Sequence, residues 1–308
     1  MNALRKALAD YLLMRRSLGY GLVRSEKLVT QFLGYLEARG EHRVTAENAL
    51  AWANLPASAH QSWRSYRLCA VRGFARHLKA FDPATEVPPA ELAPWRACRA
   101  TPYLYSDKAI ARLMAAAGSL STPHRAATYR TLIGLLAVSG MRVGEAVASN
   151  REDLDQASGV LTITKGKFGK SRELPLHEST VAALERYMRR PDRPKQAAKE
   201  HALFVSTAGT RLLYCNVSWT YGLLVARAGL KPRSASCRPR LHDIRHSFAV
   251  HTMLDSYRRD GDAAARLSLL SSYLGHVHPS HTYWYLSAAP ELLSLASRRL
   301  ERHLAGRS

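Results

Sequence analysis

The chain has 308 residues, long enough for two domains with separate hydrophobic cores, and 46% of the residues are hydrophobic. No run of eighteen apolar residues and no apolar leader near Met1 occur, so the sequence predicts a cytoplasmic protein that neither spans a membrane nor is secreted. The 45 Lys and Arg residues outnumber the 24 Asp and Glu residues, giving a net charge of +21. This favours a nucleic-acid partner, although a ribosome-associated or simply alkaline protein would have a similar composition.

The excess positive charge is spread over both halves of the chain. Residues 1–100 contain 15 basic and 8 acidic residues, and residues 101–308 contain 30 and 16. Because a basic tail would concentrate the charge, this distribution predicts two basic folded domains along a DNA path. The cysteines are widely spaced and form no CxxC pair, so we expect reduced, buried thiols. They are Cys69, Cys98, Cys215 and Cys237.

The first part of the chain is predicted to be helical. Leucines and aromatic residues at helical spacing indicate helices over residues 2–17 and 23–39, and Thr45 is a good cap for a short third helix. A fourth helix is expected over residues 61–80. Its apolar residues fall on one arc: Trp63, Tyr66, Ala70, Phe74 and Leu78. The opposite arc carries Arg64, Arg72, Arg76 and Lys79, with Arg67 at the margin. We interpret the basic arc as a DNA-binding face, with an ordinary solvated surface as the alternative.

Five prolines lie within residues 83–102, and such a density breaks helices and stiffens an extended connection. The sequence therefore predicts a helical domain over residues 1–82, a linker over 83–102 and a second domain over 103–308.

The second domain is predicted to be mainly helical with one small β-hairpin. Ser106 caps a helix that runs through Ala117, and an apolar, buried helix follows at 124–139. Residues 160–176 alternate in hydrophobicity and are bounded by glycines, which indicates an antiparallel hairpin with lysines at its tip. Further helices are expected over residues 177–189, 215–228, 243–258, 263–274 and 290–303.

Two arginines have the chemistry to hold a phosphodiester. Cleavage of this group passes through a state with extra negative charge, which a fixed cation must meet. The sequence has no acidic cluster to hold Mg²⁺, whereas the planar fork of an arginine gives a phosphate two aligned donors. Arg142 follows a glycine turn and Arg245 lies at the start of a helix, so both can be held rigidly.

Five motifs in order resemble the tyrosine recombinases, also called the phage integrase family. They are Ser139-Gly-Met-Arg142-Val-Gly-Glu145, the hairpin lysine, Leu241-His242-Asp-Ile-Arg245-His, Leu274-Gly-His276, and a tyrosine nine residues later. The match spans roughly residues 103–308, and residues 1–95 resemble the family's core-binding domain more loosely. Each motif alone is weak, but their order and spacing together make chance similarity improbable.

The resemblance implies a role for six catalytic residues. Arg142 and Arg245 would clamp the scissile phosphate, His242 and His276 would act as hydrogen-bonding and acid/base groups, and Tyr285 would be the nucleophile. The spacing from His276 selects Tyr285 over Tyr283. A Lys-x-x-Lys-x-Arg-x-x-Pro pattern ending at Pro175 selects Lys167 as the lysine that protonates the leaving 5′ oxygen, with Lys165 and Lys170 as the alternatives.

The family's properties give the remaining expectations. They imply a two-domain clamp on a specific double-stranded DNA site in the bacterial nucleoid, a 3′-phosphotyrosine intermediate, and no metal, cofactor or ATP. A homotetramer, or a heterotetramer with related recombinases, would exchange strands, and helix 290–303 could join subunits or pack on its own domain. The segment after Thr282 resembles recombinases of mobile elements. Integration, excision and resolution remain open.

Three alternative functions agree with parts of the sequence. A DNA-binding relative that needs accessory partners would keep the fold, and a type IB topoisomerase would share the cleavage chemistry without exchanging partners. The His242-Asp-Ile-Arg-His246 stretch is superficially similar to a zinc-protease motif, with His276, His278 or His281 as a third ligand. The zinc reading leaves the net charge unexplained and places Arg245 beside a dication.

Overall fold

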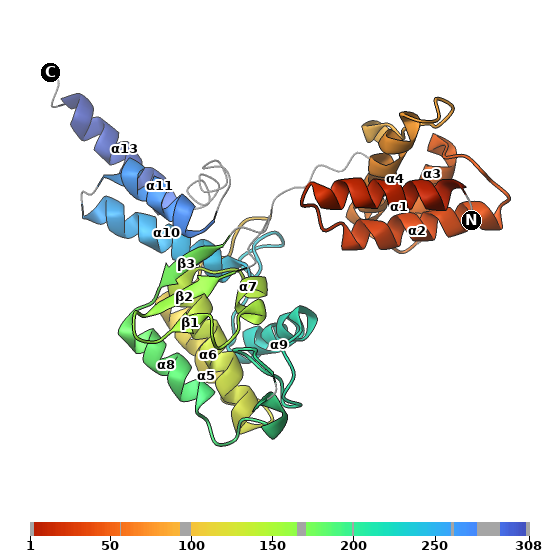
Figure 1. The fold of residues 1–308 in the computed structure, drawn as a ribbon. Coiled ribbons are helices and arrows are strands. Elements are labelled where there is room, and N and C mark those ends of the chain that lie inside the picture. The colour runs from red at the N-terminus through yellow and green to blue at the C-terminus, as the bar shows by residue number, and fades with distance from the viewer. Residues whose placement is uncertain are drawn as a thin grey trace. The chain divides into compact units, whose positions relative to one another are not determined.

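The structure is a computed structural model that describes residues 3–55, 57–92, 100–164, 171–198, 200–259, 262–275 and 290–305. The chain divides into two compact units, Met1–Arg99 and Ala100–Ser308 (Figure 1). The division falls within the proline-rich stretch at residues 83–102. Each unit has a hydrophobic core of its own.

The described residues of the first unit form four helices and a short 3₁₀ turn. They are α1 (Ala3–Ser17), α2 (Val23–Ala38), α3 (Ala46–Asn54), α4 (Gln61–Lys79) and η1 (Ala90–Leu92). The side chain of Thr45 caps α3 by accepting the backbone N–H of Asn48 at 3.1 Å, as the sequence predicts. Helix α4 contacts the other three helices, and Phe32, Trp52 and Phe74 lie at the centre of the core.

The buried face of α4 differs from the predicted arc. Its buried apolar residues are Leu68, Val71, Phe74, Ala75 and Leu78, whereas Tyr66 is 40% exposed. Arg67, which we placed at the margin, is also buried. Its guanidinium lies 3.7 Å from the centre of the Trp52 ring and donates to the Trp52 carbonyl at 2.7 Å. The aromatic ring and the carbonyl together replace water around this cation, which explains how a charge can lie on the core side.

The second unit follows the predicted order of elements. Its helices are α5 (Asp107–Ala117), α6 (Pro123–Ser139), α7 (Val143–Ala148), α8 (Glu178–Met188), η3 (Lys195–Ala198), α9 (Tyr214–Arg227), α10 (Asp243–Arg258), α11 (Ala263–Tyr273) and α13 (Pro290–Ala305). Its strands are β1 (Leu154–Asp155), β2 (Val160–Ile163) and β3 (Arg172–Pro175). The prediction of a mainly helical fold with a small antiparallel sheet is confirmed, and α7 and β1 are additions to it.

The three strands form one antiparallel sheet in the order β1-β2-β3. In the predicted hairpin, Leu161 pairs with Leu174 and Ile163 pairs with Arg172. Leu161 and Leu174 are completely buried, so the sheet turns one face into the core. The hairpin tip, with Lys165, Lys167 and Lys170, lies outside the described residues.

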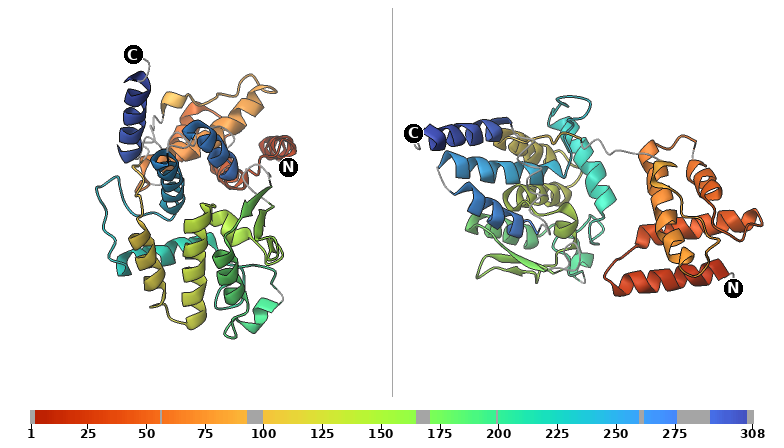
Figure 2. Two further views of the ribbon diagram at one scale, coloured as in Figure 1. Left: turned by 90° about the vertical axis from the view of Figure 1, so that its left-hand side faces the viewer. Right: turned by 90° about the horizontal axis from the view of Figure 1, so that it is seen from above.

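Helix α6 is the central element of this unit. It lies between α5 and α8 and also contacts α10 (Figure 2, left). Leu132, Ile133, Leu135 and Leu136 are all buried, as expected for a helix that is apolar on several sides. Ser106 and Thr122 cap α5 and α6 through their side chains.

Helices α10, α11 and α13 enclose a second, smaller cluster of apolar residues in this unit. Leu292 is buried against α10, and Glu291 forms an ion pair of 2.6 Å with Arg258. The first turn of α13 therefore packs on its own unit, whereas Leu293 is 56% exposed.

Two smaller expectations can be compared with the structure. Cys69 and Cys215 are exposed, so the prediction of buried thiols is wrong for them, whereas Cys237 is buried. Within the described ranges, none of the helices is both long enough and apolar enough to cross a membrane.

Candidate active site

Arg142 is placed by a sharp turn between two helices. Helix α6 ends at Ser139, and Gly140 adopts a left-handed conformation with φ of 58°. A Cβ atom added at this glycine would lie 2.3 Å from the ring of Phe248, so no other residue fits without displacing that ring. Arg142 then takes an extended conformation and is the N-cap residue of α7. Its side chain is 25% exposed.

Glu145 fixes Arg142 from inside the unit. Its carboxylate accepts the backbone N–H of Arg142 at 2.9 Å and the Nη1 of the same residue at 2.7 Å. A second arginine, Arg172 of β3, also donates to both carboxylate oxygens. Burial acts to raise the pKa of Glu145, but the hydrogen bonds and charges of Arg172 and Arg142 outweigh it and lower the pKa to about 2. Glu145 is therefore ionised at neutral pH.

Arg245 lies in the first turn of α10 and is only 2% exposed. Its Nη1 donates to the carbonyl of Gly140 at 2.9 Å, and its Nη2 donates to the carbonyl of Leu274 at 2.5 Å. The first carbonyl belongs to the turn that precedes Arg142, so the two predicted clamp residues are held by one short segment. The second belongs to the turn that leads into His276.

His242 lies immediately before α10, and its ring meets that of His246 edge to face at 4.9 Å between centroids. His242 has an exposed surface. Desolvation by the protein around it, together with the charges of His246, Arg245 and Arg142, lowers the pKa of His242 from its ordinary value of 6.5 to about 4. The histidine is therefore a neutral imidazole at pH 7, and both predicted arginines act on it.

A second buried acid of this region is Asp243, which is 2% exposed. Burial raises its pKa to about 6, although a hydrogen bond from the backbone of Tyr103 and the charge of Arg240 act in the opposite direction. Its Oδ1 lies 3.7 Å from Nδ1 of His246. Among the described residues, its other oxygen has no hydrogen-bond partner.

The structure thus brings Arg142, His242 and Arg245 together, whereas Lys167, His276 and Tyr285 lie outside the described residues, as does Tyr283. Sequence reasoning used Arg172 only to set the hairpin register and missed its contact with Glu145. The sole signal for it was its fixed distance from Pro175 in the lysine pattern. Within the described part of the chain, no three His, Cys, Asp or Glu side chains are placed to hold a metal ion.

The four predicted DNA-binding residues of α4 differ in their surroundings. Arg64 donates to the carbonyl of Ala57 at 2.7 Å. Arg72 donates to the carbonyls of Pro88 and Pro89 at 2.6 and 2.8 Å, so it holds the chain that follows the helix. Arg76 and Lys79 are exposed on the helix surface.

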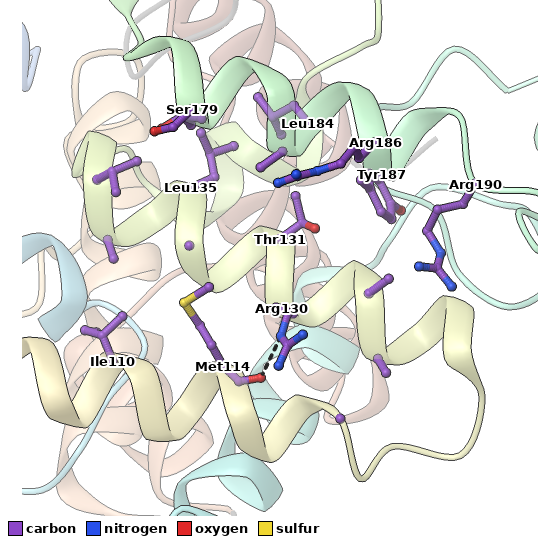
Figure 3. Close-up of a pocket in the computed structure, with 18 of the residues that line it drawn as sticks. Ile110, Met114, Arg130, Thr131, Leu135, Ser179, Leu184, Arg186, Tyr187 and Arg190 are labelled. Atoms are coloured by element: carbon purple, nitrogen blue, oxygen red, sulfur yellow. Dashed lines mark hydrogen bonds between the residues drawn. The ribbon is translucent and has the colours of Figure 1, made fainter.

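A cavity of about 710 Å³ lies between α5, α6 and α8 (Figure 3). Small and apolar residues of α6 line it, with Met114 of α5 below and Leu184 of α8 above in this view. Arg130 crosses toward α5 and donates to the Met114 carbonyl at 3.4 Å. Of the predicted catalytic residues that the structure describes, Arg142, His242 and Arg245 do not line this cavity.

The chain is similar to known integrases over its whole length. The Phage integrase family profile matches residues 104–291. A predicted integrase/recombinase of Sinorhizobium fredii, y4rB, is 44% identical over 100% of both chains. A tyrosine recombinase XerC of Pseudomonas fluorescens is 29% identical over 79% of this chain and 77% of its own.

Solved structures support the fold. The Tn1549 transposon integrase in complex with transposon right end DNA superposes with a TM-score of 0.65 at 14% identity, covering 97% of this chain and 98% of that one. A lambda integrase from a tetramer bound to a Holliday junction superposes with a TM-score of 0.58 at 17% identity, covering 92% and 76%. The chain therefore belongs to the phage integrase family and is a tyrosine recombinase that cleaves and rejoins DNA.

Proposed function

We propose that this recombinase serves a mobile element and cuts each DNA strand with Tyr285, without a metal ion. The observation that carries the proposal is the joint placement of Arg142, Arg245 and His242. Two guanidinium groups and a neutral imidazole in one place suit the non-bridging oxygens of a phosphodiester, which gain negative charge as the bond is attacked. The match with an integrase/recombinase over the full chain supports the mobile-element role.

The two arginines have different tasks in this proposal. Arg142 is a quarter exposed and meets the phosphate from the solvent side. Arg245 is nearly buried and fixed by two carbonyls, so it forms the floor of the site. Neither side chain can lose its proton near neutral pH, so the positive charge is present throughout the reaction.

His242 acts as a hydrogen-bond donor to the phosphate. Its lowered pKa keeps it neutral at pH 7, so one ring nitrogen carries a proton and the other does not. A bound phosphate would offset the charges of Arg245 and Arg142, and the pKa of His242 would then rise toward its ordinary value. The histidine thereby strengthens its hold as negative charge develops.

The remaining groups complete the transfer. The phenolic oxygen of Tyr285 attacks phosphorus, a new P–O bond forms, and the bond to the 5′ oxygen breaks. The tyrosine proton passes to His276, and Lys167 gives a proton to the leaving 5′ oxygen, which becomes a free hydroxyl. The 3′-phosphotyrosine keeps the energy of the broken bond, so a 5′ hydroxyl from the same or a partner duplex can reverse the step without ATP.

Strand exchange also needs a complete assembly on DNA. Residues 1–82 would contact one side of the duplex, with Arg76 and Lys79 of α4 as exposed cations and Arg64 and Arg72 lying partly within the fold. Residues 103–308 would carry the catalytic groups. Four subunits would bring two duplexes together, as a homotetramer or with related recombinases. The lambda integrase structure is a tetramer bound to a Holliday junction, which supports this arrangement.

The test uses nicked duplexes taken from the DNA that flanks the gene, incubated with the protein in EDTA and run on a denaturing gel. We expect a covalent protein–DNA band that Tyr285→Phe abolishes and Tyr283→Phe retains. A labelled partner duplex with a free 5′ hydroxyl should then become joined to the cleaved strand.

Other results would point elsewhere. A band that forms only when Mg²⁺ is supplied contradicts the mechanism. Relaxation of supercoiled DNA without joining of a partner duplex identifies a topoisomerase-like activity. Tight DNA binding with no covalent band on any duplex identifies a relative that depends on accessory partners.

A further inference from the structure

Arg172 joins three segments of the catalytic unit that are far apart in the chain. It stands at the start of β3, and its side chain is 14% exposed. Its Nη1 and Nη2 donate to the two oxygens of Glu145 at 3.0 and 2.7 Å. Its Nε donates to the carbonyl of Tyr273, the last residue of α11, at 3.0 Å. One planar group thus connects α7, the hairpin and the end of α11.

One anchor of Arg172 also holds a predicted phosphate-binding residue, and the other lies next to a carbonyl that does. Glu145 accepts two hydrogen bonds from Arg142. The carbonyl of Leu274, next in the chain after that of Tyr273, accepts from Arg245. Arg172 and Arg245 therefore bind neighbouring carbonyls at the C-terminal end of α11, where helix carbonyls have no partner within the helix.

The turn after α11 is shaped to receive Arg172. Gly275 adopts a left-handed conformation with φ of 66°, and a Cβ atom added there would lie 3.1 Å from Nη1 of Arg172. The guanidinium thus packs directly against the backbone of the residue that precedes His276. A side chain at this position would push against the contact that fixes the turn.

We propose that Arg172 is a positioning residue for the cleavage reaction. It orients Arg142 through Glu145 and fixes the turn at residues 273–275 that leads into His276, without itself contacting DNA. The inference rests on the proposed function because it takes Arg142 and His276 as phosphate-site residues. In this proposal Arg172 acts only through other residues. It connects the hairpin that bears the predicted lysine to Arg142 and Arg245.

A lysine cannot perform this task. It carries the same charge but a single nitrogen, so it cannot donate along the fixed fork to both oxygens of Glu145 and also reach the Tyr273 carbonyl. Arg172→Lys therefore keeps a positive charge beside the Glu145 carboxylate but removes the connection between Glu145 and the Tyr273 carbonyl. A misplacement of about 1 Å at a reacting group can cost roughly a hundredfold in rate. We expect the cleavage rate to fall by roughly ten- to a hundredfold, with unchanged DNA affinity.

The matched control is Arg193→Lys. Arg193 also bridges separate segments of this unit, donating to the carbonyls of Ala202 and Leu203, and it lies over the Tyr187 ring away from the cluster. Its replacement disturbs packing to a similar degree without touching Glu145 or the 273–275 turn. We expect Arg193→Lys to lower the melting temperature and to leave the cleavage rate unchanged.

The measurement is the single-turnover rate of covalent complex formation on a nicked duplex, beside the dissociation constant for the same duplex and the melting temperature. A second variant, Arg172→Ala, is assayed with and without guanidinium ion at a few tens of millimolar, against potassium chloride at equal ionic strength. We expect guanidinium to restore cleavage several-fold in Arg172→Ala and to leave Arg193→Lys unaffected. This second readout stays available if the lysine variant folds poorly.

The possible outcomes separate failure of the proposed function from failure of the positioning role of Arg172. If the wild-type protein forms no Tyr285-dependent adduct, the proposed function fails and the inference fails with it. If the adduct forms and Arg172→Lys cleaves as fast as the wild type, the inference alone is overturned. A loss of DNA affinity that matches the loss of rate would assign Arg172 to DNA contact instead. If the cleavage rate and the melting temperature fall together to the same extent in Arg172→Lys and Arg193→Lys, Arg172 only stabilises the fold and the inference is overturned.

Discussion

Glu145 is a carboxylate enclosed by two arginines, and its surroundings determine how the catalytic unit responds to acid. Its pKa of about 2 lies below the ordinary value of 4.5 because Arg172 and Arg142 favour the ionised form more than burial opposes it. A group whose pKa is lower in the folded state stabilises the fold above its unfolded pKa. This stabilisation is complete above about pH 4.5 and is lost as the pH falls toward about 2.

We therefore expect Glu145→Gln to lower the free energy of unfolding of the catalytic unit by roughly 3 kcal/mol at pH 7, because the variant loses the stabilisation that comes from a folded pKa of about 2 against the ordinary value of 4.5. The difference between the variant and the wild type should shrink as the pH is lowered through 4.5 toward 3. Urea unfolding at pH 7, 5 and 3 measures both effects. Asp192→Asn is the control, because its ion pair with Arg190 is about a third exposed and solvent screens it. A constant difference at all three pH values would contradict the assigned cause.

At the scale of elements, the turn between α6 and α7 has the glycine that tolerates substitution least among the described residues. Gly140 has φ of 58°, and its carbonyl accepts the Nη1 of Arg245. Gly140→Ala should destabilise the unit by roughly 3 kcal/mol or more, because the added Cβ meets the Phe248 ring and the left-handed conformation is strained for alanine. Gly144→Ala, two residues into α7, has nothing within 4 Å of its added Cβ and should be neutral or stabilising by up to about 1 kcal/mol.

Differential scanning fluorimetry of the two alanine variants checks this prediction. Gly140→Ala should melt well below the wild type, and Gly144→Ala at or above it. Equal melting temperatures for both variants would show that the Phe248 ring can move aside without cost.

The elements that the sequence predicts well are those with local signals. The helix caps Thr45 and Ser106 can be recognised from the local sequence, and the alternating hydrophobicity of residues 160–176 identifies the hairpin. Strand β1 has two residues and exists only through its pairing with β2, so no local pattern identifies it. Helix α7 has six residues, fewer than two full turns, and periodicity cannot detect it.

The candidate site also contains residues that local motifs identify and contacts that only the folded structure reveals. Arg142, His242 and Arg245 lie in short motifs, and the structure places them together. The contact of Arg172 with Glu145 spans 27 residues and its contact with Tyr273 spans 101, so both depend on tertiary packing. Arg67 illustrates the opposite error: helical periodicity places it at the margin of the basic arc, whereas the Trp52 ring and carbonyl hold it in the core.

For the whole molecule, the two units should fold separately and share the work of binding DNA. Each has its own core, and positive charge is distributed over both halves. We expect residues 3–92 and residues 100–305, expressed apart, each to unfold in one cooperative transition. Each should bind a duplex weakly, and the intact chain should bind much more tightly because linkage makes the second contact intramolecular.

The salt dependence of binding tests the role of the first unit. The slope of log affinity against log salt reports the number of phosphates neutralised. The intact chain should therefore show a steeper slope than residues 100–305, and Arg76→Ser and Lys79→Ser should each reduce that slope by about 1. Fluorescence anisotropy on one duplex at several salt concentrations measures this. If the slopes of the intact chain and residues 100–305 coincide, α4 does not contact the DNA backbone.

The anchoring of Arg245 has a consequence for the order of synthesis. Its two carbonyl partners lie 105 residues before it, at Gly140, and 29 residues after it, at Leu274. On the ribosome, Arg245 is therefore made when one partner already exists and the other has yet to be translated. A nascent chain that stops short of Leu274 lacks the carbonyl that accepts from Nη2 of Arg245. On the proposed roles, the phosphate site is completed late in translation, after most of the catalytic unit has been made.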